Sequence, residues 1–145
     1  MQNFPLVSVI CLSYNHKAYV VEALNSVINQ TYPNIELLIA DDCSSDNSIG
    51  VIKDWVKNHP EVHFSTNEKN LGNTKTFNQL AKIAKGEFII DLAADDLLVP
   101  NCIEKQVTTF QNSKYKNLGI VYGNLIEIDE KGNFLNNYYN KEDSP

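Results

Sequence analysis

The stretch EFIIDLAADDLLVPN, residues 87–101, joins an apolar run to two adjacent carboxylates, Asp95 and Asp96. The apolar part has the length and composition of a buried strand. Aspartate is a poor strand former and is rarely buried without a partner, so the two acids mark the point where the strand ends. A second acidic pair, Asp41 and Asp42, follows another apolar run in the same way.

The rest of the chain alternates apolar runs with stretches whose apolar residues recur at helical spacing. The predicted strands are residues 6–13, 35–40, 62–66, 87–93 and 118–129. A helix is predicted after each of the first four strands, and the third helix is expected to close at Lys85-Gly86. Strands that alternate with helices favour an α/β fold, with a mainly parallel sheet and helices on both faces.

The length and composition of the chain indicate how many domains it forms and which partners and locations are expected. A chain of 145 residues suits one domain, and its 12 basic and 18 acidic residues give a net charge of -6, which argues against nucleic acid as a partner. No apolar run could span a bilayer and the N-terminus lacks the features of a signal peptide, so a cytoplasmic location is expected. Cys11, Cys43 and Cys102 show no metal-binding spacing and are predicted to be core or passive thiols.

Polar side chains from three separate stretches are expected to meet at one edge of this sheet. In open parallel sheets ligands bind beyond the carboxyl ends of the strands, where Ser13-Tyr14-Asn15 and both acidic pairs would lie. Neither a GxGxxG nor a GxxxxGK[ST] motif is present, which excludes the common phosphate-binding loops. Paired aspartates could instead hold a divalent cation that bridges to a diphosphate. Because neighbouring residues of an extended chain point to opposite sides, Asp95 and Asp96 are expected to have different roles.

Each of these features also has a purely structural interpretation. Either acidic pair could cap the following helix or form an Asx turn, and Tyr14 could cover the edge of the core. The three histidines have no metal-ligand spacing and are interpreted as ordinary surface or strand residues. Three polar clusters at three strand ends nevertheless favour a binding site over structural roles for all of them.

Five stretches together resemble glycosyltransferase family 2, whose members are inverting enzymes of the GT-A fold that use nucleotide sugars. They are PLVSVICLSYN (5–15), NQTYPNIELLIADDCSSDNS (29–48), NEKNLGN (67–73), AKGEFIIDLAADDLLVPN (84–101) and LGIVYGN (118–124). The resemblance runs over nearly the whole chain, and it is specific for family and fold rather than for substrate.

The resemblance implies a role for each matched position. Tyr14 corresponds to the aromatic residue that packs on the base, and the main chain of Leu12 lies beside that base. Asp42 corresponds to the acid that binds uracil, Asp95 to the residue near the ribose, and Asp96 to the ligand of a Mn²⁺ or Mg²⁺ ion that bridges the diphosphate.

The chain also departs from the family pattern. Ala93 stands where many relatives carry a first acid, and Phe77 stands where relatives often carry an arginine, which leaves Lys75 as a candidate cation for the diphosphate. The acceptor site and the catalytic base belong to a C-terminal half in this family. The base is therefore expected beyond residue 145, residues 1–145 are interpreted as a truncated nucleotide-sugar-binding part, and the chain alone is expected to be inactive.

The resemblance thus implies transfer of a sugar, with inversion, from a nucleotide-diphosphate donor, expected to be a UDP-sugar, to a saccharide or lipid acceptor. A cell-surface polysaccharide or glycolipid is the expected product, and the full-length protein could associate with the inner face of the membrane. Two alternatives remain open at this point. One is a non-catalytic module that binds a nucleotide sugar, and the other is a metal-dependent nucleotidyl- or phosphotransferase.

Overall fold

A computed structural model describes residues 4–139, and the chain divides into two compact units, Met1–Lys105 and Gln106–Pro145. The first unit holds β1 (Val7–Ser13), α1 (Val20–Ile28), β2 (Ile35–Asp41), α2 (Ser48–Val56), β3 (His63–Thr66), α3 (Asn73–Ala81) and β4 (Phe88–Ala93). Helix α4 (Cys102–Gln111) crosses the boundary between the units, and the second unit holds β5 (Ile126–Ile128) and β6 (Phe134–Asn137). The first four predicted strands are confirmed to within one or two residues at each end.

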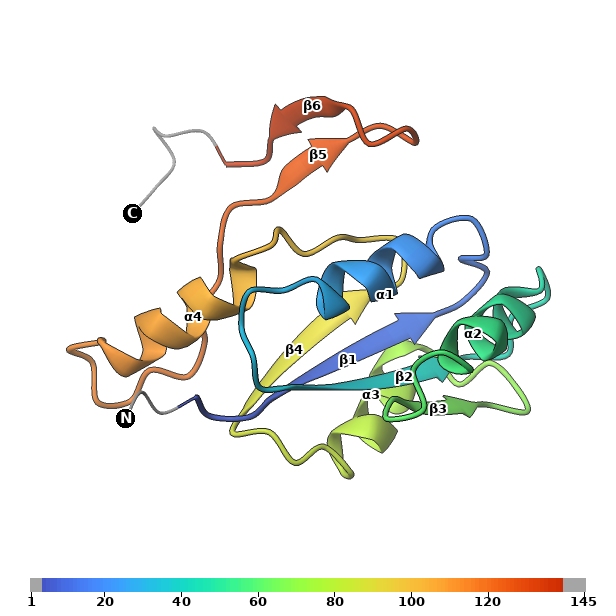
Figure 1. The fold of residues 1–145 in the computed structure, drawn as a ribbon, viewed down its shortest axis with the longest axis horizontal. Coiled ribbons are helices and arrows are strands. Elements are labelled where there is room, and N and C mark those ends of the chain that lie inside the picture. The colour runs from blue at the N-terminus through green and yellow to red at the C-terminus, as the bar shows by residue number, and fades with distance from the viewer. Residues whose placement is uncertain (1–3, 140–145) are drawn as a thin grey trace. The chain divides into compact units, whose positions relative to one another are not determined.

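The first unit is built on a four-stranded parallel sheet with the order β3-β2-β1-β4 (Figure 1). Its register sets Ser13, the last residue of β1, opposite Asp41, and sets Leu12 opposite Ala93. The carboxyl ends of the strands therefore meet at one edge of the sheet, and this edge carries both acidic pairs.

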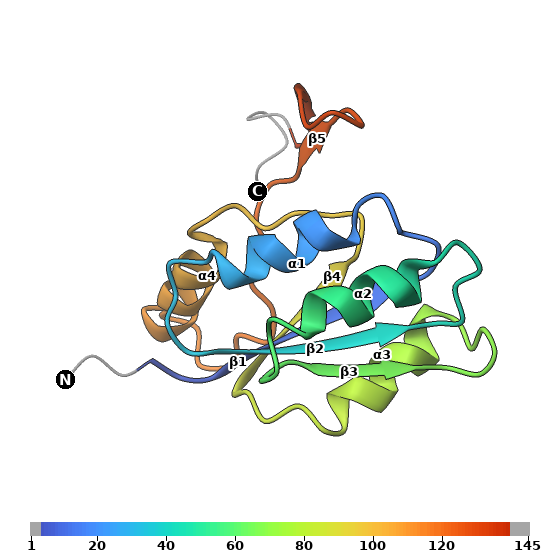
Figure 2. The ribbon, with the colours of Figure 1, turned by 45° about the vertical axis from the view of Figure 1, so that its right-hand side comes forward.

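Helices cover both faces of this sheet, as the sequence predicts. Helices α1 and α2 lie on one face and α3 lies on the other (Figures 1 and 2). Every residue of β1 is buried, which is the pattern of a strand enclosed on both faces. On the α3 face Leu80 packs in one core cluster with residues of the two central strands, namely Ile10, Leu12, Leu38 and Ala40. Within the described residues, no helix is both long and apolar enough to cross a bilayer.

The prediction that the third helix closes at Lys85-Gly86 is wrong, because α3 ends at Ala81. The Glu36 carboxylate at the start of β2 accepts hydrogen bonds from the main-chain N–H of Lys85, at 2.5 Å, and of Gly86, at 3.1 Å. Ser8 also donates to Glu36 and accepts from the Gly86 N–H at 2.8 Å. This network holds the chain in an extended approach to β4 at a point where helical spacing alone would continue the helix.

Gly86→Ala is expected to destabilise the first unit. A Cβ atom at this position would lie 2.5 Å from the main-chain nitrogen of Ser8 and 2.7 Å from the carbonyl oxygen of Phe88, so the backbone would have to shift. Overpacking of this kind costs about 1–3 kcal/mol in the free energy of unfolding, which urea denaturation would measure. Gly119→Ala is the control, because a Cβ atom there meets nothing within 4 Å. Equal stability of the two variants would contradict the close approach at Gly86.

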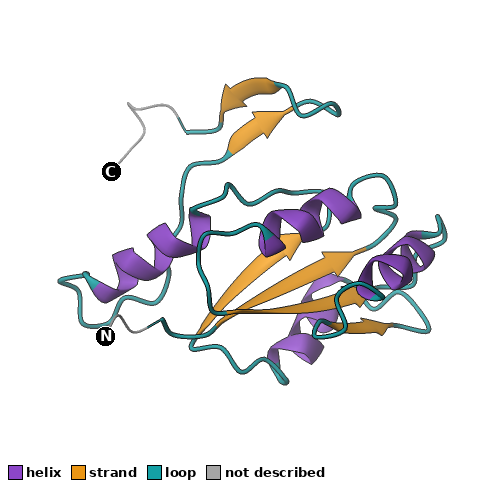
Figure 3. Ribbon diagram, viewed as in Figure 1, coloured by secondary structure: helices purple, strands orange, loops and turns teal. Residues whose placement is uncertain are grey.

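The second unit contains a short antiparallel pair, β5 and β6. The prediction of a strand over residues 118–129 is wrong for most of its length, since only Ile126–Ile128 is a strand and the preceding residues form a loop (Figure 3). A turn joins the two strands between residues 129 and 133. The Asp129 carboxylate accepts from the main-chain N–H of Lys131 at 2.9 Å and of Asn133 at 2.8 Å, while Gly132 takes a φ of 80°.

Candidate functional site

The loops that follow β1 and β2 are tied together by hydrogen bonds between side chains and main chain. The Asn15 side chain accepts from the Ser45 N–H at 2.8 Å, and the Asn15 N–H donates to the Ser44 hydroxyl at 2.8 Å. The Lys17 N–H donates to the Asp46 carboxylate at 2.9 Å. Asn15 takes a left-handed φ of 60°, a conformation that asparagine tolerates better than most residues. The two loops therefore form one ordered surface at the edge of the sheet.

Asp41 has a structural role in the loop that follows β2. Its side chain is fully buried, and it accepts hydrogen bonds from the Ser13 hydroxyl at 2.9 Å and from the Ser44 N–H at 2.7 Å. The N-cap residue of α2 is Asn47, and the N–H of Ser48, the first residue of the helix, donates to the Asp46 carboxylate at 2.9 Å. The acidic pair therefore does not cap the following helix.

Asp42 connects the end of β2 to the loop before α3. Its carboxylate is buried, with the residue only 5% exposed. Oδ1 accepts from the Asn67 side chain at 2.7 Å and from the Leu71 N–H at 2.9 Å, while Oδ2 accepts from the Gly72 N–H at 2.8 Å. The Thr76 side chain also hydrogen-bonds to this carboxylate.

The pKa of Asp42 reflects two opposing causes. Burial raises the pKa. Hydrogen bonds, first from the Leu71 main chain and then from Asn67, lower it by more than burial raises it, so the net pKa lies below the usual value. The group is consequently a carboxylate at neutral pH, fixed in position by N–H donors.

Asp95 and Asp96 lie directly beyond β4, and a histidine lies beside them. Nε2 of His16 lies 3.7 Å from Oδ2 of Asp95, which joins the loop after β1 to the loop after β4. Sequence reasoning missed this contact, because it treated His16 as an ordinary surface residue. Its position directly after the Ser13-Tyr14-Asn15 cluster was the available signal.

Asp96 has the properties of a carboxylate that could bind a cation. It is exposed, and in residues 4–139 no hydrogen bond to its carboxylate is found. Burial of part of the side chain and the charge of Asp95 both raise its pKa, so a positive ion would relieve this unfavourable environment. Among the described residues, no group of three or more His, Cys, Asp or Glu side chains could hold a metal ion. The exposed Asp96 carboxylate could be one ligand of an ion whose remaining ligands come from a bound phosphate and water.

The two other predicted site residues differ in their exposure. Tyr14 is 47% exposed, so its ring is available to a ligand and is not a cover for the core. Leu12 is 7% exposed, and its carbonyl accepts from the Ala94 N–H at 3.0 Å. Lys75, the proposed basic group, is exposed in the first part of α3.

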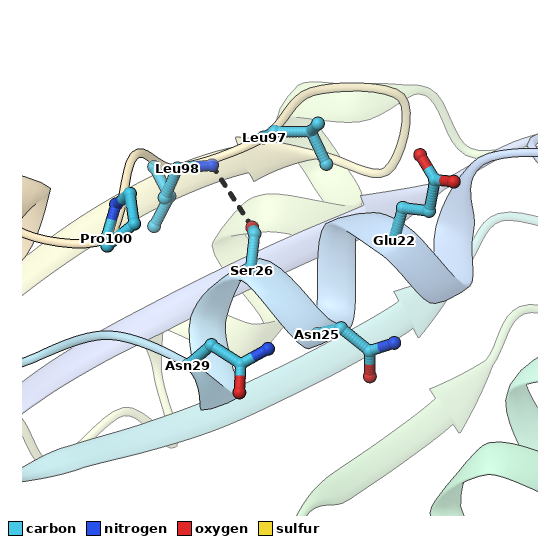
Figure 4. A pocket seen from close by; sticks show the side chains of 7 residues that line it. All are labelled: Glu22, Asn25, Ser26, Asn29, Leu97, Leu98 and Pro100. Carbon is cyan, nitrogen blue, oxygen red and sulfur yellow. Dashed lines mark hydrogen bonds between the residues drawn. The ribbon is translucent and has the colours of Figure 1, made fainter. Parts of the chain in front are cut away.

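A groove of about 370 Å³ lies between α1 and the segment that follows Asp96. It is lined by Glu22, Asn25, Ser26, Asn29, Leu97, Leu98 and Pro100 (Figure 4). The Ser26 hydroxyl accepts from the Leu98 N–H at 3.1 Å, and the Gln30 side chain donates to the Val99 carbonyl at 2.8 Å. None of the predicted site residues lines the groove, and these hydrogen bonds fix the segment that carries Asp95 and Asp96 against α1.

The buried cysteine of β1 is not a candidate nucleophile. Burial, with a smaller contribution from Asp91, raises the pKa of the Cys11 thiol to about 12. The thiolate is the reactive form, so Cys11 is inert at neutral pH, as the sequence predicts.

The family model described as glycosyl transferase family 2 matches residues 8–143 of the chain. The chain belongs to glycosyl transferase family 2. The match extends over both acidic pairs and over the four parallel strands, and it confirms the expected family and α/β fold.

Relatives in this family are longer than the present chain. Chondroitin synthase of Escherichia coli is 34% identical over 140 residues, which is 97% of this chain and 20% of that protein. The glycosyltransferase GlyG of Streptococcus pneumoniae is 35% identical over 130 residues, which is 89% of this chain and 42% of that protein. The chain therefore spans less than half the length of these family 2 glycosyltransferases.

Solved structures support the GT-A fold. Residues 1–349 of S. aureus TarS in complex with UDP give a TM-score of 0.66 at 25% identity, and the match covers 81% of this chain and 38% of TarS 1-349. The mannosyltransferase PcManGT from Pyrobaculum calidifontis, in complex with GDP-Man and Mn²⁺, gives a TM-score of 0.67 at 22% identity. That match covers 78% of this chain and 34% of PcManGT, and it supports the fold alone.

Proposed function

We propose that this chain is the donor-binding part of an inverting glycosyltransferase that uses a UDP-sugar and a saccharide or lipid acceptor. The observation that carries the proposal is that Asp42, the exposed Tyr14 and the Asp95-Asp96 pair follow three parallel strands whose carboxyl ends lie at one edge of the sheet, in a family 2 chain. The complexes of S. aureus TarS with UDP and with UDP-GlcNAc favour uridine as the base.

The nucleoside would be held by groups from the first two strand ends. The ring of Tyr14 offers a face on which a base can stack, and the main chain of Leu12 would lie beside it. The Asp42 carboxylate would accept the uracil N–H, and it would need no reorganisation to do so because N–H donors of the protein already fix its position.

The ribose and the diphosphate would lie against the end of β4. Asp95 would accept hydrogen bonds from the ribose hydroxyls, and Asp96 would hold a Mn²⁺ or Mg²⁺ ion together with the phosphate oxygens. When bound, this ion would supply Lewis-acid stabilisation of the negative charge on the diphosphate.

In the transfer itself, an acceptor hydroxyl attacks the anomeric carbon from the face opposite the nucleotide. A new glycosidic bond forms, the bond from the anomeric carbon to the diphosphate oxygen breaks, and UDP leaves with the bonding electron pair. The hydroxyl proton goes to a general base, for which no described residue is assigned. This chain would contribute by fixing the donor in a reactive orientation.

Isothermal titration calorimetry with UDP tests the donor site. The chain is expected to bind UDP weakly, and binding is expected to require Mn²⁺ because the carboxylates at this edge otherwise repel the diphosphate. Uridine, which lacks the diphosphate, should bind with an affinity that does not depend on Mn²⁺. Equal affinity for UDP in Mn²⁺ and in EDTA would contradict the metal role. If neither UDP nor uridine bound, the donor-site assignment would be wrong.

A further inference from the structure

His16 is held in place by the start of α1. Its carbonyl oxygen accepts from the N–H of Tyr19 at 3.0 Å and from the N–H of Val20 at 2.9 Å. Its side chain is only 26% exposed, so the imidazole has little freedom to move. The ring is therefore held in a defined position at the start of α1.

The two ring nitrogens of His16 have different environments. Nδ1 is buried and has no hydrogen-bond partner in the described residues, whereas Nε2 lies 3.7 Å from Oδ2 of Asp95. The Asp95 side chain is 49% exposed, and a small rotation of it would bring the carboxylate into hydrogen-bond distance. An acceptor on the Nε2 side favours the tautomer that carries its proton on Nε2.

We infer that His16 is a positioning residue for Asp95: it holds that carboxylate toward the ribose and so leaves Asp96 as the acid that binds the cation. This inference rests on the proposed function of the same site. It assigns the two adjacent acids to different tasks by a physical cause, because the Asp95 carboxylate lies 3.7 Å from Nε2 of His16, whereas within the described residues no hydrogen bond to the Asp96 carboxylate is found.

The electrostatics of the pair agree with this division. Two carboxylates at neighbouring positions repel each other, and an unrestrained Asp95 would compete with Asp96 for the same ion. The N–H on Nε2 gives the Asp95 carboxylate a donor partner. His16 also acts on Asp96, whose pKa it lowers against the larger opposing effects of burial and Asp95.

The test measures UDP affinity by calorimetry in Mn²⁺ for His16→Ala, His16→Gln, His16→Asn, Asp95→Ala and the double variant His16→Ala/Asp95→Ala. His16→Ala is expected to weaken UDP binding by up to about tenfold, the loss that corresponds to one hydrogen bond between Asp95 and the ribose. His16→Gln should recover most of this loss, because the glutamine amide N–H can reach the position of Nε2. His16→Asn should not, because its shorter amide reaches only the position of Nδ1. The double variant should bind no more weakly than Asp95→Ala, since the histidine acts through that acid.

His59 provides a matched control for a histidine paired with an acid away from the site. Its Nδ1 lies 3.7 Å from Oε1 of Glu61, and its side chain is also 26% exposed. His59→Ala should leave UDP affinity unchanged even if it lowers the melting temperature through loss of its stacking on Trp55.

The outcomes separate the inference from the proposed function. Wild-type affinity in His16→Ala, or additive losses in the double variant, would overturn the role of His16 and leave the donor site standing. If His16→Ala does not fold, equal affinities of the Gln and Asn variants would overturn it in the same way. Failure of the wild-type chain to bind UDP would overturn both.

Discussion

Asp96→Asn is expected to abolish most of the effect of Mn²⁺ on UDP binding. Asparagine keeps the size of the side chain but removes the negative charge that would hold the ion. Loss of residues that merely support metal ligands weakens binding 10- to 100-fold, so loss of the ligand itself should weaken UDP binding by about 100-fold in Mn²⁺. Affinity for uridine should stay near that of the wild type, because no diphosphate and no ion take part. Calorimetry with the two ligands measures both effects.

Asp54→Asn is the control for the change in net charge. Asp54 is an exposed acid on α2 that pairs with Lys57 at 2.7 Å and takes no part in the proposed site. If Asp96→Asn and Asp54→Asn both bind UDP like the wild type, the charge of Asp96 does not hold the cation, and the metal assignment is lost.

Asp42→Asn is expected to reduce both the stability of the fold and the affinity for uridine. The carboxylate accepts three N–H donors, and an asparagine would direct its own N–H groups at one of them. A mismatched buried polar contact costs about 1–3 kcal/mol in the free energy of unfolding. The same substitution removes the proposed acceptor for the uracil N–H, so uridine and UDP should weaken by similar factors, with or without Mn²⁺.

The stability loss in Asp42→Asn should depend on pH in a defined direction. The folded protein lowers the pKa of Asp42 below its unfolded value, so its contribution is complete above the unfolded pKa and is lost as the pH falls through the lower folded pKa. The difference in the free energy of unfolding between wild type and variant should therefore be constant from about pH 5 to pH 8 and shrink below about pH 4. Urea denaturation at a series of pH values measures it.

Asp46→Asn separates the effect on folding from the effect on binding. Asp46 also accepts main-chain hydrogen bonds at this edge, from Lys17 and Ser48, and its pKa is lowered although its own burial acts in the opposite direction. It has no proposed contact with the nucleotide, so Asp46→Asn should lose stability and keep uridine affinity. If Asp42→Asn also lost stability but kept its affinity for uridine, the base-binding role of Asp42 would be contradicted.

Much of the first unit could be predicted from local sequence because its elements have strong local causes. The run that became β1 is apolar on both faces, and α1 carries its buried residues at one helical spacing. The end of α3 could not be predicted in this way. The acceptor that holds the chain there, Glu36, lies 49 residues away from Lys85 in the sequence.

In the second unit, prediction from the sequence failed for a different reason. The run between 118 and 129 has the composition of a strand, but strands are stabilised by their neighbours, and only Ile126–Ile128 has a described partner, in β6. β-propensity alone therefore overestimated the length of this strand.

The acidic residues of the candidate site could be predicted from the sequence, but the groups that contact them could not. Strand ends and adjacent aspartates are visible in the sequence, and the parallel sheet brings Asp42, Asp95 and Asp96 to one edge. The contact of His16 with Asp95 joins two loops 79 positions apart. The N–H groups of Leu71 and Gly72 belong to the main chain, so no residue type marks them in advance.

The hydrogen bonds that join the loops at this edge limit which substitutions the protein can accept during evolution. In many enzymes the functional residues reduce stability, so replacing them makes the fold more robust at the cost of activity. Here Asp41 and Asp42 are themselves supports of the edge, and Asn15 anchors the loop that carries the exposed Tyr14. A substitution of Asp42 that removes the proposed donor site would therefore also reduce the stability of the fold. New specificity is therefore more accessible through exposed positions such as Tyr14 and Lys75 than through the buried acids beneath them.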